Sequence, residues 1–275
     1  MNSKAMSLKA KIRNYAVENK IAAQTVLQNY MFERFLDRLS HSIHKDSFII
    51  KGGMLIAALV GLDTRSTMDL DTTLQGLPLT EKSILMAIED ITRIDLDDGV
   101  LFSIVSIAPI RRDDIYGGFC LRVNAVYDTI VTPLSIDVST GDIITPNAIA
   151  YAFSGLLDEN IQIHVWGYNI ETVMAEKIET ILSRGTLNTR PRDYYDVYIL
   201  HKSKPYDKSV FEKALIATST HRGSSESITD RAGILARISV SSDLQNMWSK
   251  YRQKYPYARE ISYDEVMAVL RELLL

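Results

Sequence analysis

Apolar and polar residues follow two different spacings along this chain, and the change falls near residue 166. In residues 1–165 short apolar runs, several of them alternating with polar positions, predict β-strands. Phe119, Leu121 and Val123, for example, alternate with Cys120 and Arg122, which indicates a half-buried central strand. The strands predicted in this way cover residues 47–50, 67–74, 100–108, 117–127, 133–138 and 161–166.

Helical spacing, with apolar residues three or four positions apart, accounts for most of the remaining chain. Thr80 is expected to cap one helix, and Gly185 is expected to end another. We therefore predict a mixed α/β domain at 1–165 and an all-helical domain at 166–275. The predicted helices are two or so within 7–46, then 54–60, 80–92, 170–184, 191–201, 207–218, 226–236, 241–253 and 263–274.

Charge and composition exclude several classes of protein. The net charge of −3 argues against a protein that coats nucleic acid by bulk charge, although the part from residue 166 onward has 16 basic against 14 acidic residues. Cys120 is the single cysteine, so no intramolecular disulfide is possible. The longest apolar stretch, 52–62, is far shorter than the ~20 residues of a membrane span, and the first residues lack a signal-peptide pattern. We expect a cytoplasmic protein with no membrane partner.

Two aspartates on one predicted strand form the first candidate site. Asp69 and Asp71 lie at i and i+2, so both carboxylates point to the same face, about 7 Å apart by the rise of a strand. Carboxylates at this spacing can hold a pair of Mg²⁺ ions. Asp137, which points out of a later strand, is a candidate third acid, or else a surface acid before a turn.

A glycine pair precedes these aspartates. Lys51-Gly52-Gly53 joins a strand to a helix, where small residues leave backbone N–H groups open to a phosphate. Taken singly, glycine turns and paired acids are more often structural than catalytic. Their order along the chain, with Arg65 between them, favours a nucleotide site that transfers a phosphoryl or nucleotidyl group.

The run FERFLDRLSHSIHKDSFIIKGGMLIAALVGLDTRSTMDLDTTL resembles the opening of the AbiEii family, the nucleotidyltransferase toxins of type IV toxin–antitoxin systems. The stretches LSIDVSTGDIITP and AEKIETILSRGTLNTRPRDYYDVYIL match the same family in the right order. The resemblance implies a nucleotidyltransferase fold with a mixed, mainly antiparallel sheet and a helical C-terminal lobe. It also implies that Gly52 and Gly53 bind phosphate, although many relatives in the wider DNA-polymerase-β-like superfamily have Gly-Ser here.

The same resemblance implies an activity and its participants. It points to a Mg²⁺-dependent enzyme, with two ions on Asp69 and Asp71, that moves a nucleoside monophosphate from an NTP to RNA. The expected acceptor is the tRNA 3′ end, and the expected result is a block of translation and growth. It also implies a cognate antitoxin. The further residues that it implicates in catalysis or nucleotide binding are Lys177, Arg184, Asp193 and Asp196. Two rivals stay open: a regulator that binds nucleotide or RNA without catalysis, and an enzyme that nucleotidylates protein.

Residue spacing supports a functional role for one of these further residues, Lys177. Lys177 lies on the apolar stripe of the predicted helix 170–184, either covering the edge of the core or facing a charged site. Arg190 and Arg192 follow that helix and are candidates for RNA contact, unless they only pair with nearby acids. A further basic stretch, residues 251–259, mixes cations with tyrosines. This composition suits either the binding of unpaired bases or a solvated helix end. The five histidines show no spacing typical of a zinc site.

Overall fold

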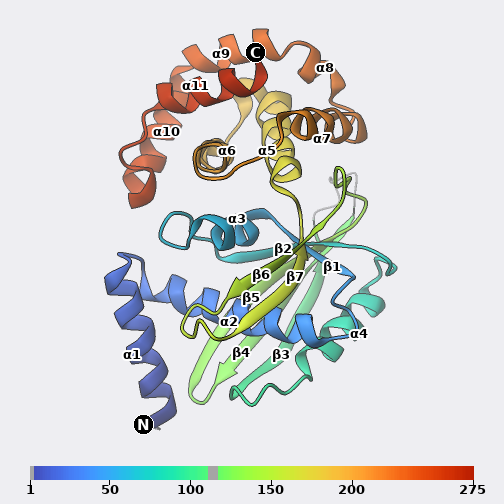
Figure 1. Cartoon of the computed structure of the whole chain (residues 1–275), viewed down its shortest axis with the longest axis vertical. Coiled ribbons are helices and arrows are strands. Elements are labelled where there is room, and N and C mark those ends of the chain that lie inside the picture. Colours follow the sequence, from blue (N-terminus) through green and yellow to red (C-terminus); the bar gives the residue numbers. More distant parts are fainter. Residues whose placement is uncertain (1–2, 111–116) are drawn as a thin grey trace. The chain divides into compact units, whose positions relative to one another are not determined.

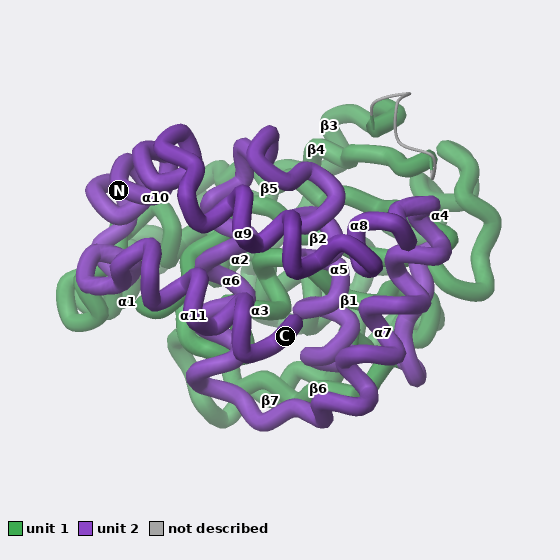
Figure 2. Tube along the Cα trace, turned by 90° about the horizontal axis from the view of Figure 1, so that it is seen from above, with its two compact units in different colours: residues 1–141, 148–168 green, residues 142–147, 169–275 purple. Residues whose placement is uncertain are grey.

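The computed structural model describes residues 3–110 and 117–275, which fold into two compact units. Unit 1 comprises residues 1–141 and 148–168, and unit 2 comprises residues 142–147 and 169–275 (Figure 2). None of the helices in the described part of the chain combines the length and apolar character that a membrane span requires.

Unit 1 is built on one sheet, which in the described residues has seven strands in the order β3-β4-β5-β2-β1-β7-β6 (Figure 1). Strands β1–β2, β3–β4, β4–β5 and β6–β7 pair antiparallel, and β2–β5 and β1–β7 pair parallel. The predicted mixed, mainly antiparallel sheet is therefore confirmed. The strands are β1 (Phe48–Lys51), β2 (Asp69–Leu74), β3 (Val100–Pro109), β4 (Gly118–Tyr127), β5 (Ile130–Ser139), β6 (Ile149–Ser154) and β7 (Gln162–Gly167).

The core of unit 1 lies between this sheet and its helices. Every second residue of β4 from Leu121 to Ala125 is buried, as the alternation predicted. Thr80 caps the fourth helix by accepting a hydrogen bond from Ser83 N–H. The helices of this unit are α1 (Ser3–Glu18), α2 (Ala23–His41), α3 (Gly52–Val60) and α4 (Glu81–Thr92).

The regular elements of unit 2, in its described residues, are all helices. Its central helix, α5 (Ile170–Arg184), begins and ends at the predicted residues, with Gly185 at the C-cap at a φ of 51°. The remaining elements are η1 (Gly185–Leu187), α6 (Pro191–Ser203), α7 (Lys208–His221), α8 (Ser225–Thr229), α9 (Arg231–Val240), α10 (Ser242–Lys254), η2 (Pro256–Ala258) and α11 (Tyr263–Leu274).

Two details differ from the sequence-based prediction. Strand β6 was not predicted, although Ile149, Tyr151 and Phe153 alternate with smaller residues. It pairs only with β7 at the edge of the sheet, and none of its residues is fully buried. The single helix predicted at 226–236 is wrong: Asp230 leaves helical geometry, with a ψ of 19°, and separates α8 from α9.

Candidate active site

Four polar side chains form a row across the middle of the sheet. Lys51 on β1 is paired with Asp71 on β2, and Asp71 is paired with Asp137 on β5. Directly paired residues point to the same face of a sheet, and adjacent strands lie about 4.8 Å apart. Asp69 lies two residues before Asp71 and so shares this face. The structure therefore brings together the lysine and the three carboxylates that the sequence singled out in this unit.

The lysine of this row is held by a neighbouring strand. Lys51 Nζ donates a hydrogen bond to Ser139 Oγ at 2.8 Å, two residues beyond Asp137 on β5. Ser139 Oγ in turn donates to the carbonyl oxygen of Thr72 at 3.3 Å. The ammonium is thus fixed over the acidic face, where a cation offsets the mutual repulsion of the carboxylates. The sequence could not indicate Ser139, because its role depends on strand register.

Gly52 lies so close to Asp71 that any added side chain would clash with this aspartate. Its φ is +64°, in the left-handed region, and a Cβ at this position would lie 2.1 Å from Asp71 Oδ2 and 2.8 Å from Asp71 Cγ. Gly52 is also the first residue of α3, whose opening N–H groups have no partner inside the helix. One acid of the row therefore lies directly against the backbone of the predicted phosphate-binding turn.

Gly53 makes a second close approach. A Cβ here would lie 2.7 Å from Thr67 Oγ1 and 3.0 Å from Arg65 Nη2. Arg65 is only 2% exposed, and its Nη1 donates to the carbonyl oxygen of Ser66 at 2.5 Å. The Arg65 guanidinium thus supports the glycine turn from inside the protein, and a direct contact with nucleotide stays a prediction.

The acidic row fits a divalent cation only in part. In residues 3–110 and 117–275 no three His, Cys, Asp or Glu side chains are grouped so that they could hold a metal ion. However, Asp137 Oδ1 is buried without a hydrogen-bond partner, and Asp69 is exposed on the same face. Mg²⁺ is commonly held by one or two carboxylates, with substrate phosphates and water completing its octahedral shell. The residues present fit a metal that arrives with a phosphate, rather than a preformed cage.

Cys120 borders the acidic row as a packed thiol. It is paired with Asp137 across β4 and β5, and its Sγ lies 3.4 Å from Ser135 Oγ. Burial raises the pKa of the Cys120 thiol, and the hydrogen bond to Asp137 raises it further. The thiol is therefore protonated at neutral pH.

Unit 2 contains a separate charged cluster. Lys177 Nζ on α5 lies 2.6 Å from Asp193 Oδ1 and 3.2 Å from Asp196 Oδ2, both on α6. The Asp196 side chain is fully buried, whereas Lys177 is 20% exposed. Asp193 Oδ2 is buried without a hydrogen-bond partner. The two aspartates thus fix the ammonium, and they differ in that Asp193 keeps a carboxylate oxygen unused.

An ion-pair network behind Lys177 was not predicted. Arg222, just beyond α7, donates to Glu176 Oε1 at 2.8 Å and to Glu179 Oε2 at 2.7 Å. Although burial opposes its charge, these glutamates raise the pKa of Arg222. The network anchors α5 on both sides of Lys177. The sequence carried no signal for it, because Arg222 lies 43 residues from Glu179.

The other predicted basic residues lie outside the cluster. Arg184 is exposed seven residues beyond Lys177, about 10 Å farther along the helix axis. Arg190 is exposed, and in the described part of the chain it forms no ion pair with Asp193 or Asp196. Arg192 Nη2 instead donates to Tyr255 Oη at 3.0 Å. The alternative in which Arg190 and Arg192 merely neutralise these aspartates is therefore wrong, since Lys177 occupies that role.

Comparison with known proteins identifies the family. The family model described as nucleotidyl transferase AbiEii toxin, type IV TA system, matches residues 34–269, which is most of the chain. The chain belongs to the AbiEii family. It is thus a transferase of the nucleotidyltransferase class and a member of a toxin family, as the sequence resemblance implied.

Two solved structures are similar to this chain over most of its length. A Helicobacter pylori protein described as a candidate nucleotidyltransferase is 15% identical, with a TM-score of 0.50 over 92% of this chain and 96% of its own. JHP933 from Helicobacter pylori is 14% identical, with a TM-score of 0.48 over 92% of both chains. The likeness to the first shows a nucleotidyltransferase fold and no more. No curated protein sequence matches the chain significantly.

Proposed function

We propose that this AbiEii protein transfers a nucleoside monophosphate from an NTP to a hydroxyl of RNA, at the 3′ end of tRNA, and thereby stops translation. The observation that carries the proposal is the acidic row beside the glycine turn. Asp69, Asp71 and Asp137 share one face of the sheet, and Gly52 lies against Asp71. A triphosphate bound by the N–H groups at the start of α3 would meet these carboxylates directly.

Each residue of unit 1 has a distinct part in this proposal. Asp69 and Asp71 hold magnesium, and Asp137 accepts the proton of the attacking hydroxyl. Gly52 and Gly53 bind phosphate oxygens through backbone N–H groups, which only residues without a side chain permit here. Lys51 lies over the carboxylates and would offset the negative charge brought by the nucleotide.

Magnesium, bound by Asp69 and Asp71 together with phosphate oxygens, would polarise the phosphorus and lower the pKa of the attacking hydroxyl. The chain's own contribution is to hold these two carboxylates at fixed register on β2 and to exclude a side chain at Gly52. The proposal includes two ions, one for the nucleophile and one for the leaving pyrophosphate.

Residues of unit 2 complete the proposed chemistry. Lys177, fixed by Asp193 and Asp196, would neutralise charge on the triphosphate, and Arg184 would contribute at the exposed end of α5. The fully buried Asp196 serves as a positioning residue in this proposal. Asp193, whose Oδ1 accepts a hydrogen bond from Lys177 Nζ, is assigned to the catalytic group together with this lysine.

An antitoxin and RNA are the macromolecular partners in this proposal. Because the family consists of type IV toxins, we propose a cognate antitoxin that relieves the growth arrest, with both proteins in the cytoplasm. Residues 177–204 contain six basic and three acidic residues, which favours contact with a polyanion. Arg190 and Arg192 are the residues assigned to the RNA backbone.

Incubation of the protein with total tRNA and each α-labelled NTP, with and without Mg²⁺, tests the function. We expect Mg²⁺-dependent label in RNA, and its loss in Asp71→Asn, which keeps side-chain volume but removes the charge. Label in protein alone would show a protein-nucleotidylating enzyme instead. Nucleotide binding without pyrophosphate release would show a non-catalytic regulator.

A further inference from the structure

A cluster of tyrosines and cations lies at the end of helix α10 in unit 2, and Arg192 is the one member to which the proposed function gives a role. Tyr255 ends the helix and Tyr257 lies in η2. Their rings stack, with centroids 5.4 Å apart and planes inclined by 24°. Tyr251, buried beneath them, has its ring centroid 4.7 Å from that of Tyr255. We call the half-buried pair Tyr255 and Tyr257 the tyrosine shelf.

Two cations lie against the outer ring of the shelf. The Arg192 guanidinium carbon is 5.6 Å from the Tyr255 centroid, and Lys254 Nζ is 5.3 Å from it. Although burial opposes ionisation, Arg192 and Lys254 lower the pKa of the Tyr255 hydroxyl. Rigid aromatic rings bordered by cations are the arrangement that binds single-stranded nucleic acid without sequence preference.

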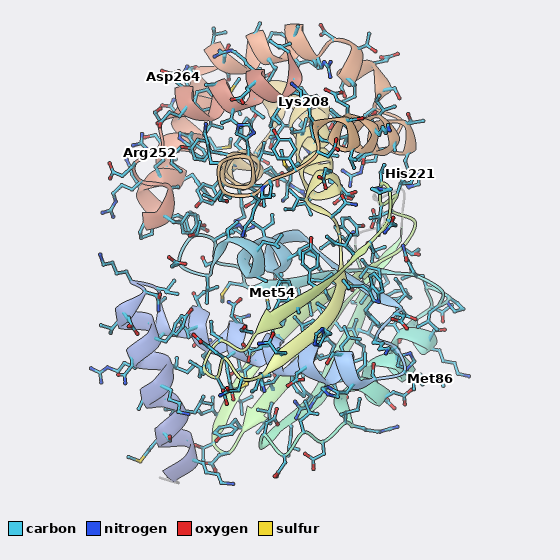
Figure 3. All side chains as sticks on the ribbon, viewed as in Figure 1. Met54, Met86, Lys208, His221, Arg252 and Asp264 are labelled. Carbon is cyan, nitrogen blue, oxygen red and sulfur yellow. The ribbon has the colours of Figure 1, made fainter. Side chains whose placement is uncertain are left out.

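The surface beside the shelf is basic as well. Residues 250–259 contain four cations and no acidic residue. Arg252 and Arg259, with Ser249 and Gln253, line a hollow of about 440 Å³ on the same segment; Arg252 is labelled on α10 in Figure 3. Arg252 Nε donates to the carbonyl oxygen of Arg259 at 2.8 Å, which holds the two ends of the segment together. A phosphate that follows a stacked base would find these cations next to it.

The shelf is also tied to the Lys177 cluster. Arg192, which bonds Tyr255, precedes Asp193, which bonds Lys177, on the first turn of α6. Tyr195, on the same helix, packs against Tyr257 with ring centroids 4.8 Å apart. One helix therefore connects the aromatic surface with residues assigned to the reaction.

We propose that the tyrosine shelf binds an unpaired base of the RNA acceptor by stacking on Tyr255, with Lys254 moving from the ring to the adjoining phosphate. This inference rests on the proposed RNA acceptor and adds the place where its single-stranded end is held. Lys254 is exposed, and such a cation–π contact is worth only about a 2- to 5-fold factor in an equilibrium constant. A stacked base is worth about 5- to 140-fold, so the exchange is favourable.

The test measures binding of a short single-stranded RNA that carries 2-aminopurine, whose fluorescence falls when it stacks, with the full chain and no NTP present. Tyr255→Leu removes the ring, while Tyr255→Phe is the matched control that keeps the ring and loses only the hydrogen bonds of the hydroxyl with Arg192 and Lys254. We expect about 5- to 140-fold weaker binding and no fluorescence quenching for Tyr255→Leu. Tyr255→Phe should bind as the unaltered protein does.

Two further measurements distinguish an RNA base from the base of the NTP and control for misfolding. A fluorescent NTP analogue should bind the unaltered protein and Tyr255→Leu equally; loss of NTP binding with unchanged RNA binding would overturn the proposal in favour of the substrate base. Equal RNA binding by all variants, or equal loss in Leu and Phe variants, would also overturn it. Tyr255→Trp retains an aromatic face and should bind RNA at least as well as Tyr255→Phe. This comparison tests stacking even if Tyr255→Leu proves unstable. Weaker RNA binding by Tyr255→Trp than by Tyr255→Phe would count against stacking. The labelling of tRNA by unaltered protein tests the proposed function separately.

Discussion

Replacement of Gly52 by alanine should inactivate the enzyme far more than it destabilises it. Backbone strain from a left-handed residue with a Cβ costs about 1–2 kcal/mol, or a fall in Tm of about 2–8 °C for a unit of this size. The larger effect comes from contact: the new Cβ would lie 2.1 Å from Asp71 Oδ2, so the carboxylate must move by about 1 Å to reach even a tight 3.0 Å. A misplacement of that size costs about 100-fold in rate.

Gly76→Ala is the matched control, because Gly76 has a φ of +71° and nothing within 4 Å of an added Cβ. Pyrophosphate release and thermal unfolding are measured on both variants. We expect strain to lower Tm in both variants, a further fall from the clash in Gly52→Ala, and a rate loss only in Gly52→Ala. Adding Asp71→Ala should restore part of the stability lost in Gly52→Ala, since it removes the two nearest atoms of the clash. Comparable rates in the two glycine variants, with no coupling to Asp71, would refute the reasoning.

Three further predictions follow from side-chain environments. Lys177→Met leaves the buried Asp193 and Asp196 without their cation, so urea unfolding should show a loss of about 3–5 kcal/mol, and a loss under 1 kcal/mol would contradict the geometry. Asp98 has a lowered pKa, because hydrogen bonds from Arg38 and Val100 N–H outweigh its burial. The ionised Asp98 therefore stabilises the fold above its ordinary pKa of 3.8, and this stabilisation is lost as pH falls through the lower folded-state pKa. Asp98→Asn should accordingly flatten the acid limb of a curve of Tm against pH. Arg190→Glu alters an exposed side chain and should leave Tm unchanged while weakening RNA labelling and reducing the log–log salt slope by roughly 0.7–0.9, whereas an unchanged slope would remove Arg190 from the RNA surface.

The sequence predicted those parts of the fold that depend on local pattern. Helix α5 begins and ends where its cap residues indicate, and the alternation around Val123 matches the buried face of β4. Asp69 and Asp71 point to the same face because the side chains of a strand repeat every two residues, and this inference needs no tertiary information. Strand β6 was missed although Ile149, Tyr151 and Phe153 alternate with smaller residues, so a period of two residues was present in the sequence.

Interactions between distant segments could not be predicted. The hydrogen bond from Lys51 to Ser139 spans 88 positions, and the contact of Arg192 with Tyr255 spans 63. Such contacts depend on strand register and helix packing, which a single sequence does not encode in any short window. The clash at Gly52 is of the same kind, since only the fold brings Asp71 against that glycine.

The short segment 142–147 affects how the protein can assemble during synthesis. It belongs to unit 2 although the chain then returns to unit 1 for β6 and β7, and its carbonyl groups at Thr145 and Asn147 accept hydrogen bonds from Asn169. As the chain leaves the ribosome, this segment emerges before its partners, and unit 1 is complete only after Gly167 has appeared. An isolated fragment that starts at Asn169 would lack both acceptors at the start of α5. The helical unit is therefore expected to mature only after the sheet has received its last strand, and a fragment that starts at Asn169 is not expected to reproduce it.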